Sequence, residues 1–354
     1  MSIADEQRVS ASGATTAQSA SQPDAYSPQV IRKLNALTSD FYAREAASFS
    51  ATRQAPWHGW EKAWELITAP DAAQGPFPSH AAVRDSLSSR AARIPDDYAS
   101  NSKDSLAVLD LGCGNLRFER FLAERTNAPL RVTALDNCPD LASPEIGALS
   151  AAFPHSLRSS SAASKTKEED ASGQGANPPE KTIVDLRALD IVESLLDGTF
   201  ADRLPRNSHD LAVAFGLMHH LPTFALRARV LEGILGSLRP GGFAVVSFWQ
   251  FLNDPRLAAK AATVTAEGRA AHRLPTFQEN DFLLGWQHAE GTYRFCHHTP
   301  EDEIDALLAA IREPSAPSTS GCAPPAPLPF REIARFSADG KLGNLNRYLI
   351  LQRL

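Results

Sequence analysis

Apolar runs alternate with amphipathic stretches through the middle of the chain, and this alternation predicts an ordered series of strands and helices. The predicted strands are 106–111, 131–136, 182–190, 209–216 and 241–251. Helices are predicted for Arg117–Arg125 and from about Thr223 to Leu238, where Pro240 and two glycines follow as stop signals. Near-continuous runs of Val, Leu, Ala and Ile joined by helices indicate a parallel sheet that is covered on both faces.

The C-terminal part of the chain departs from this alternation. An irregular stretch is expected from Asn253 to His298. A helix should follow, with Thr299 as its N-cap, Pro300 in its first turn and acidic residues at its positive end. The chain then ends in two strand-like segments, PFREIARFS and RYLILQRL, with a polar, glycine-containing turn between them. This pattern predicts an antiparallel strand pair at the sheet edge.

Three segments contain too few large apolar residues to join a core. Residues 1–28 lack the basic start and apolar centre of a signal peptide and are expected to form a disordered tail. Residues 155–182 and 313–329 are rich in Ser, Pro, Gly and Ala, and we expect disordered insertions there. The structured pattern resumes directly after each, so both belong to one α/β domain, 106–354. A helical cap, 29–105, precedes this domain.

Composition narrows the range of partners. The chain has 354 residues and a formal net charge of -6, so no overall basic field attracts nucleic acid or an anionic membrane. No apolar stretch is long enough to cross a bilayer, so no membrane partner is expected. The four cysteines are scattered without a CxxC pair, which is typical of the reducing cytoplasm and not of a zinc site or a disulfide framework.

The first predicted strand ends in a glycine-rich turn, V-L-D-L-G-C-G-N, and a helix follows. Gly112 and Gly114 let the backbone turn tightly and approach a ligand at the carboxyl end of the strand. The second strand ends in Asp136, at the place where an acidic residue binds the ribose of a nucleoside cofactor. A dinucleotide site would have a third glycine where this chain has Arg117, which disfavours a dehydrogenase.

This D-x-G-x-G turn resembles the first motif of the class I S-adenosylmethionine-dependent methyltransferases. The resemblance implies a Rossmann-like, seven-stranded sheet, parallel with an antiparallel C-terminal edge pair and with helices on both faces. It also implies S-adenosyl-L-methionine as cofactor, with Asp136 at the ribose, Asp190 near the adenine and Ile191 stacking beside it. Leu116 departs from the family, many of whose members have a third glycine there. The cofactor-binding residues implied are Asp110, Gly112, Cys113, Gly114, Asp136, Asn137, Asp190, Ile191, Phe215 and Gly216.

A second resemblance is narrower. The segment F-S-A-T-R-Q-A-P-W, 49–57, is similar to one in the wobble-uridine tRNA methyltransferases, which methylate a carboxymethyl group on tRNA and whose domain is fused to an AlkB-type oxygenase in animals. His219-His220 match that family's histidine pair, and L-G-W (284–286) and Y-R-F-C-H-H (293–298) resemble its later segment. The resemblance implies a modified uridine in tRNA as acceptor, tRNA as partner and, in some members, a small activator protein. Residues 253–298 would then cover the acceptor site.

Three residues are the candidates for catalysis. The planar fork of Arg53 suits either the methionine carboxylate of the cofactor or a carboxylate on the acceptor; the alternative is a surface arginine over Trp57. His219 and His220 are expected to line the acceptor pocket, with loop capping as the alternative. Adjacent histidines rarely bind one ion well, so no metal is expected.

Two interpretations compete for the acceptor. The acidic composition and the scarcity of basic residues in the insertions argue against tRNA as the acceptor. The alternative acceptor is a small-molecule carboxylate, hydroxyl or amine. A non-catalytic subunit that keeps the fold is a further alternative, against which the intact Gly112, Gly114 and Asp136 argue. Tyr293 and Arg294 fit stacking on a base or a place in an edge strand equally well, whereas Trp286 is expected to pack in the core.

Overall fold

The computed structural model describes residues 26–68, 105–126, 128–142, 157–159, 182–286, 291–313 and 328–354. The rest of the expected tail, cap and insertions lies outside these residues. One large sheet has the strand order β3-β4-β2-β1-β5-β6-β10-β9, and a two-stranded sheet pairs β7 with β8. The strands are β1 Leu106–Leu111, β2 Leu130–Asp136, β3 Leu157–Ser159, β4 Thr182–Ala188, β5 His209–Ala214, β6 Leu238–Trp249, β7 Asp281–Leu284, β8 Arg294–His297, β9 Phe330–Ala338 and β10 Asn346–Arg353.

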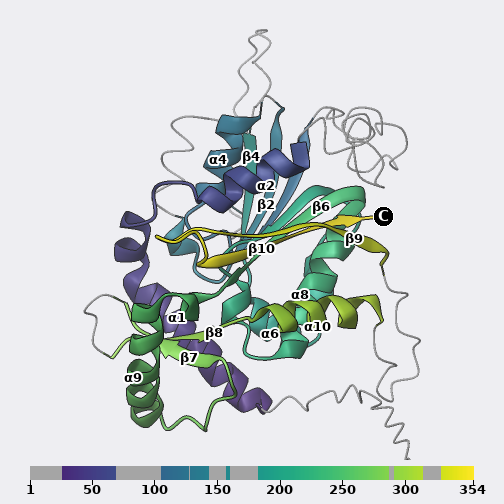
Figure 1. Ribbon diagram of the computed structural model, residues 1–354. Helices are drawn as coiled ribbons and strands as arrows, with labels where there is room; N and C mark the ends of the chain where they lie inside the picture. Colours follow the sequence, from purple (N-terminus) through teal and green to yellow (C-terminus); the bar gives the residue numbers. More distant parts are fainter. Residues whose placement is uncertain are drawn as a thin grey trace, which may run out of the picture.

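The large sheet confirms the fold predicted from the sequence. Strands β3, β4, β2, β1, β5 and β6 are parallel, and β10 runs antiparallel to both of its neighbours, β6 and β9. Seven of these strands form the Rossmann-like sheet of the class I methyltransferase fold, with the C-terminal pair at one edge (Figure 1). The short β3 adds an eighth strand at the other edge, within the range 155–182 that was expected to be disordered.

Helices pack on both faces of the sheet. The helices are α1 Pro28–Ala51, α2 His58–Thr68, α4 Arg117–Arg125, α6 Ile191–Leu196, α7 Phe200–Arg203, α8 Phe224–Ser237, α9 Pro255–His272 and α10 Glu301–Arg312. Alternate residues of β1 enter two separate apolar clusters: Leu109 and Leu111 join α6, α8 and α10, whereas Val108 joins α2 and α4. Figure 1 shows these two groups of helices on opposite sides of the strands. Burial on both faces explains why the parallel strands are apolar without alternation.

Helix α1 begins earlier than the sequence analysis placed the end of the tail. Ser27 is the N-cap, and its side chain accepts a hydrogen bond from the Val30 N–H, while Pro28 occupies the first turn. The ring of Tyr26 is buried, and its hydroxyl donates to Asp281 Oδ2 at 2.8 Å. The tail predicted for 1–28 is therefore wrong at its end, because a Ser-Pro helix start was read as part of a polar, low-complexity segment.

The stretch 253–298, expected to be irregular, contains a long helix and two strands in its described part. Asp254 caps the 18-residue helix α9 by accepting from the Arg256 N–H, and Pro255 follows at the first position. Helix α9 packs on the hairpin β7–β8, and both lie beside α1 (Figure 1). The helix escaped prediction because only Ala261 and Gly268 of it are buried, so its sequence carries little apolar periodicity.

Helix α10 forms as predicted but starts one residue later. Pro300 occupies the N-cap position and Thr299 is fully buried before it, so Thr299 is not the cap. Glu301, Asp302 and Glu303 lie in the first turn, where the helix dipole favours negative charge. Within the described residues, no helix combines the length and the apolar character that crossing a membrane requires.

Candidate active site

The glycine turn after β1 leaves an open space at the carboxyl edge of the parallel sheet. Gly112 and Gly114 have φ values of 75° and 56°, in the left-handed region that favours glycine. A Cβ built on Gly114 would meet no atom within 4 Å. Leu116, the departure from the family pattern, also has a positive φ of 54°, and its side chain is completely buried. Burial of that side chain offsets the backbone strain of the left-handed conformation.

Asp136 fixes the shape of this turn. Its Oδ2 accepts a hydrogen bond from the Gly114 N–H at 2.8 Å, and its Oδ1 accepts one from the Cys138 N–H at 2.7 Å. Burial raises the pKa of this carboxyl, and the backbone donors oppose that change. Each oxygen keeps a second acceptor site, so the carboxylate can still bind ribose hydroxyls from the open side.

Asp110 and Cys113 are buried around the turn instead of facing the open space. Asp110 is 2% exposed and Glu119 is 1% exposed, and neither oxygen of Glu119 has a hydrogen-bond partner among the described residues. Burial raises the pKa of Asp110 well above its usual value and that of Glu119 to about 7, so protonation of these buried carboxyls is favoured. The sequence analysis predicted Asp110 but not Glu119, which read as an ordinary helix-face residue.

The F-S-A-T-R-Q-A-P-W segment is bound to the start of α4. Side chains of Asn115, Arg117 and Arg120 donate to the backbone carbonyls of three consecutive residues of this segment at 2.8–3.0 Å; the acceptors are Arg53, Ala55 and Gln54, respectively. These contacts explain why Arg117 stands where a dinucleotide site would have glycine. It is Arg117, and not Arg53, that lies over Trp57, at 5.2 Å from the ring centroid. The alternative in which Arg53 covers Trp57 is therefore wrong.

Asp190 and Asn137 link the sheet to α1. Asp190 caps α6 by accepting from the Glu193 N–H, and both of its oxygens also accept from Asn35 Nδ2 at 3.0 and 2.8 Å. Asn137 donates to Ser39 Oγ at 2.8 Å. Both predicted residues thus lie at the expected edge, but a contact of Asp190 with an adenine would compete with donors that it already has.

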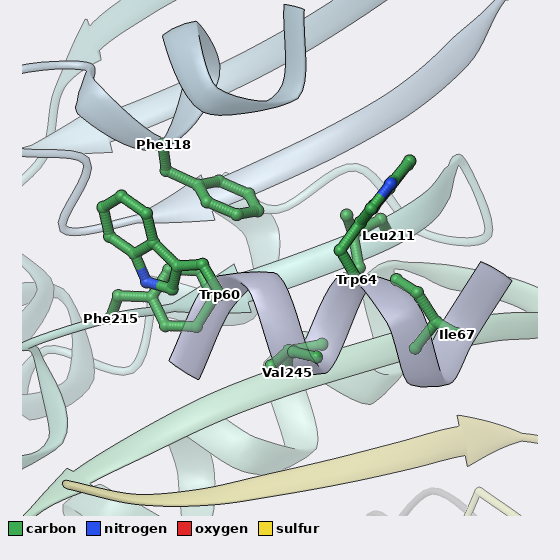
Figure 2. Close-up of a pocket in the computed structure, with 8 residues that line it drawn as sticks. Trp60, Trp64, Ile67, Phe118, Leu211, Phe215 and Val245 are labelled. Atoms are coloured by element: carbon green, nitrogen blue, oxygen red, sulfur yellow. The ribbon is translucent and has the colours of Figure 1, made fainter. Parts of the chain in front are cut away.

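The side chains of Phe215 and Ile191 lie in the apolar clusters. Phe215 packs against Trp60 and Phe118, with ring centroids 5.4 and 4.8 Å apart. Figure 2 shows Phe215, Trp60 and Phe118 among the residues that line a small apolar hollow beside α2. Ile191 is buried among the helices of the opposite face. The Phe215 backbone and Gly216, with φ 71°, remain at the end of β5, where the predicted cofactor contact would be made by the main chain.

His220 is held in one neutral tautomer. Its Nδ1 lies 2.7 Å from the Phe295 carbonyl oxygen, which can only accept, so Nδ1 carries the proton. Its Nε2 therefore accepts from the Tyr42 hydroxyl at 2.9 Å. Burial, with the nearby charge of Arg294, lowers the pKa of His220 to about 3. His220 thus positions Tyr42 and β8 and is a poor candidate for a general base. Tyr42 is a site residue that the sequence analysis missed, and it lies seven residues before the family-like segment 49–57.

His219 is buried beside His220. It is 6% exposed, its ring lies 4.0 Å from that of His220 and 5.0 Å from that of Trp249, and its Nδ1 has no partner among the described residues. Burial and the neighbouring His220 and Arg294 hold its pKa well below the usual range. The nitrogens of the two histidines and the Cys296 sulfur lie within 4.8 Å of one another. A metal ion there would displace Tyr42 and face Arg294, so we assign none.

Two arginines complete the site, and only Arg53 was predicted. Arg53 lies over the rings of Phe49 and Trp286, at 3.7 and 4.7 Å from the centroids. Arg294, in β8, lies over the same two rings at 5.7 and 5.8 Å. Trp286 therefore belongs to the site, and its Nε1 donates to Ser48 Oγ at 2.9 Å. The sequence analysis left Arg294 between stacking on a base and a place in an edge strand, and the structure places it in strand β8.

The chain is similar to solved structures described as methyltransferases. One, an S-adenosylmethionine-dependent methyltransferase from Methanosarcina mazei, is 17% identical, with a TM-score of 0.41 over 73% of this chain and 94% of that one. The 1,6-didemethyltoxoflavin-N1-methyltransferase of Burkholderia thailandensis is 16% identical, with a TM-score of 0.40 over 89% of this chain and 88% of that one. A Mesorhizobium loti methyltransferase is 16% identical, with a TM-score of 0.36 over 77% and 97%.

Neither a protein-family description nor a curated protein matches this sequence. The topology of its own sheet assigns the fold, and its own residues at the carboxyl edge define the site.

Proposed function

We propose that this chain transfers a methyl group from S-adenosylmethionine to an acceptor bound beneath α1. The observation that carries this proposal is the turn after β1, in which Gly114 faces open space while Asp136 binds its N–H. The glycine backbone and the Asp136 carboxylate thus lie next to an open space at the carboxyl edge of a parallel sheet. This edge is where α/β proteins bind nucleoside cofactors.

The residues at this edge fit the cofactor. The Gly112–Gly114 backbone would lie against it, Asp136 would accept from its ribose hydroxyls, and Arg53 would hold its methionine carboxylate. When bound, the cofactor supplies a sulfonium methyl carbon that is open to in-line displacement. The described residues of the chain would then hold the acceptor atom in line and exclude water, as positioning requires.

The electrostatics favour an acceptor that needs no proton removed. Both histidines have pKa values well below the usual range, and two arginines lie beside them, so a strong general base is disfavoured. A carboxylate is already deprotonated at neutral pH. An acceptor carboxylate would also be attracted by the two guanidiniums.

For the acceptor itself we propose a carboxymethyl-type uridine of tRNA, with a small-molecule carboxylate, hydroxyl or amine as the alternative. The support for tRNA is the F-S-x-T-R-x-x-P-W resemblance, whose arginine and tryptophan lie against the glycine turn and α2 in this chain. The net charge of -6 supports the alternative, or a separate partner that supplies the basic surface for tRNA.

A labelled methyl group tests both levels of this proposal. The protein would be incubated with labelled S-adenosylmethionine and either bulk tRNA or a small-metabolite extract, each from cells that lack the protein. Asp136→Asn should abolish transfer, whereas Asp140→Asn, an exposed carboxylate on the following turn, should not. Label in tRNA nucleosides would support the tRNA acceptor, and label in the extract alone would support the small molecule. Failure of the wild type to bind S-adenosylhomocysteine would refute the methyltransferase proposal itself.

A further inference from the structure

Arg294 carries a buried positive charge that the described part of the chain does not neutralise. The residue is 5% exposed, and its Nε and Nη1 lie buried without a hydrogen-bond partner. No carboxylate of the described residues forms an ion pair with it, although its side chain contacts the Cys296 thiol. Burial raises the pKa of that thiol to about 11, so it remains protonated and supplies no negative charge. An uncompensated buried charge is expensive, and proteins keep one mainly where a ligand completes it.

A second guanidinium lies close to the first. Arg53 and Arg294 share the rings of Phe49 and Trp286. Burial, together with the charge of Arg294, lowers the pKa of Arg53 to about 10. Among the described side chains Arg53 donates only to the hydroxyl of its neighbour Thr52, at 3.1 Å. Two like charges thus lie near each other, and no carboxylate of the described residues forms an ion pair with either.

The surrounding rings define how a ligand can reach these groups. The guanidinium of Arg294 also lies over Phe41 at 4.6 Å and over Trp249 at 5.6 Å, so aromatic rings surround it. Aromatic rings stabilise the faces of a guanidinium and leave its edges for hydrogen bonds. The unpartnered Nε–H and Nη1 groups point to different sides of the guanidinium, and each can donate a hydrogen bond to a ligand oxygen.

We propose that Arg294 and Arg53 together form a carboxylate-binding site, to which Arg294 donates from an N–H group that lacks a partner among the described residues. Two carboxylates can occupy it, that of the methionine part of the cofactor or one on the acceptor. The identity of these two sources rests on the proposed function, whereas the site itself rests only on the residues described above. Arg294 is then a specificity residue that selects an acidic ligand over its neutral amide.

The first experiment uses acetate and acetamide, which have the same shape but differ in charge. The Nε–H resonances of the arginines are followed by NMR during titration of the full chain, and Arg294→Gln identifies the Arg294 signal. Acetate should shift this signal in a saturable way and acetamide should not, while exposed Arg256 serves as internal control. An Arg294 signal that acetate leaves unchanged, or that acetamide shifts equally, would overturn the proposal.

The second experiment identifies the source of the carboxylate. S-adenosylhomocysteine and its decarboxylated analogue are titrated into wild type, Arg294→Gln and Arg294→Lys by calorimetry. If the cofactor supplies the carboxylate, both variants should bind S-adenosylhomocysteine roughly tenfold or more weakly and the analogue unchanged. If the acceptor supplies it, the variants should bind both compounds as wild type does, and acetate should still shift Arg294 in the wild-type complex.

The two proposals fail in different ways. If acetate shifts the Arg294 signal but the chain binds no S-adenosylhomocysteine, the proposed methyl transfer is refuted and the carboxylate-binding site is supported. Normal binding of S-adenosylhomocysteine with a silent Arg294 would refute the carboxylate site alone. A thermal melt of each variant shows that it is folded, and the wild-type titration needs no variant.

Discussion

Substitution of Gly114 by alanine separates ligand contact from backbone strain. Gly114 and Gly343 both have positive φ, 56° and 68°, and a Cβ on either would meet no atom within 4 Å. An alanine at either position must adopt the left-handed conformation, which costs about 1–2 kcal/mol. Gly343 lies in the turn between β9 and β10, away from the glycine turn that follows β1.

We therefore expect the two variants to lose similar stability and to differ in ligand binding. A loss of about 1–2 kcal/mol corresponds to a fall in melting temperature of roughly 2–8 °C for a domain of this size. The new methyl group at Gly114 would occupy the space into which the cofactor is proposed to fit. Because this methyl group would displace the cofactor, Gly114→Ala should bind S-adenosylhomocysteine about tenfold or more weakly. Gly343→Ala should bind it as wild type does.

Calorimetric titration of both variants, beside thermal melts, measures the two effects separately. Equal affinity of Gly114→Ala and Gly343→Ala for S-adenosylhomocysteine would show that the space at Gly114 is not the cofactor site. A much larger loss of stability in Gly114→Ala than in Gly343→Ala would show that the space is filled in solution.

Three further predictions concern the groups around the site. Tyr42→Phe leaves His220 Nε2 without its donor and should lower the free energy of unfolding by about 1–3 kcal/mol in chemical denaturation. The Tyr293 hydroxyl has no partner in the described residues, so Tyr293→Phe should lower it by less than half of that. Burial lowers the pKa of His209 to about 4, so between pH 6.5 and 4 only the unfolded chain takes up the proton. The free energy of unfolding should therefore fall by up to about 3 kcal/mol as the pH drops from 6.5 to 4. A His209→Gln variant whose free energy of unfolding depends on pH as that of wild type does would contradict this. Glu303→Gln removes the carboxylate that binds buried Arg227 and His297 at 2.7 Å and should lower the free energy of unfolding by about 3–5 kcal/mol. Asp305→Asn, at an exposed carboxylate, should lower it by less than about 1 kcal/mol. Equal melting temperatures of the two variants would refute this.

The parallel core was predictable because its strands are buried on both faces. Such strands read as continuous apolar runs, so β1 and α4 were placed at their observed bounds and the other core strands within a few residues. The glycine turn and the position of Asp136 beside it were predictable for a related reason, since both follow from residue types at a fixed spacing along the chain.

The parts that escaped prediction depend on contacts between distant segments. Helix α9 buries too little of itself to show a period, and its role comes from the hairpin on which it packs. Arg294 is 241 residues from Arg53 in sequence, and nothing local to either shows that they share two aromatic rings. Glu119 looked like a helix-surface residue until its place beside Asp110 was known.

The reach of α1 across the chain has a consequence for synthesis on the ribosome. Its flanking Tyr26 binds Asp281, 255 residues later, and its Thr38 receives the N–H of Phe295, 257 residues later. At about 5–20 residues per second, the helix leaves the ribosome on the order of 10–50 s before these partners exist. Its apolar side, with Leu34 and Phe41, is therefore exposed through most of translation. A nascent chain that ends before the hairpin β7–β8 should bind chaperones through α1, and closure of the site is among the last events in folding.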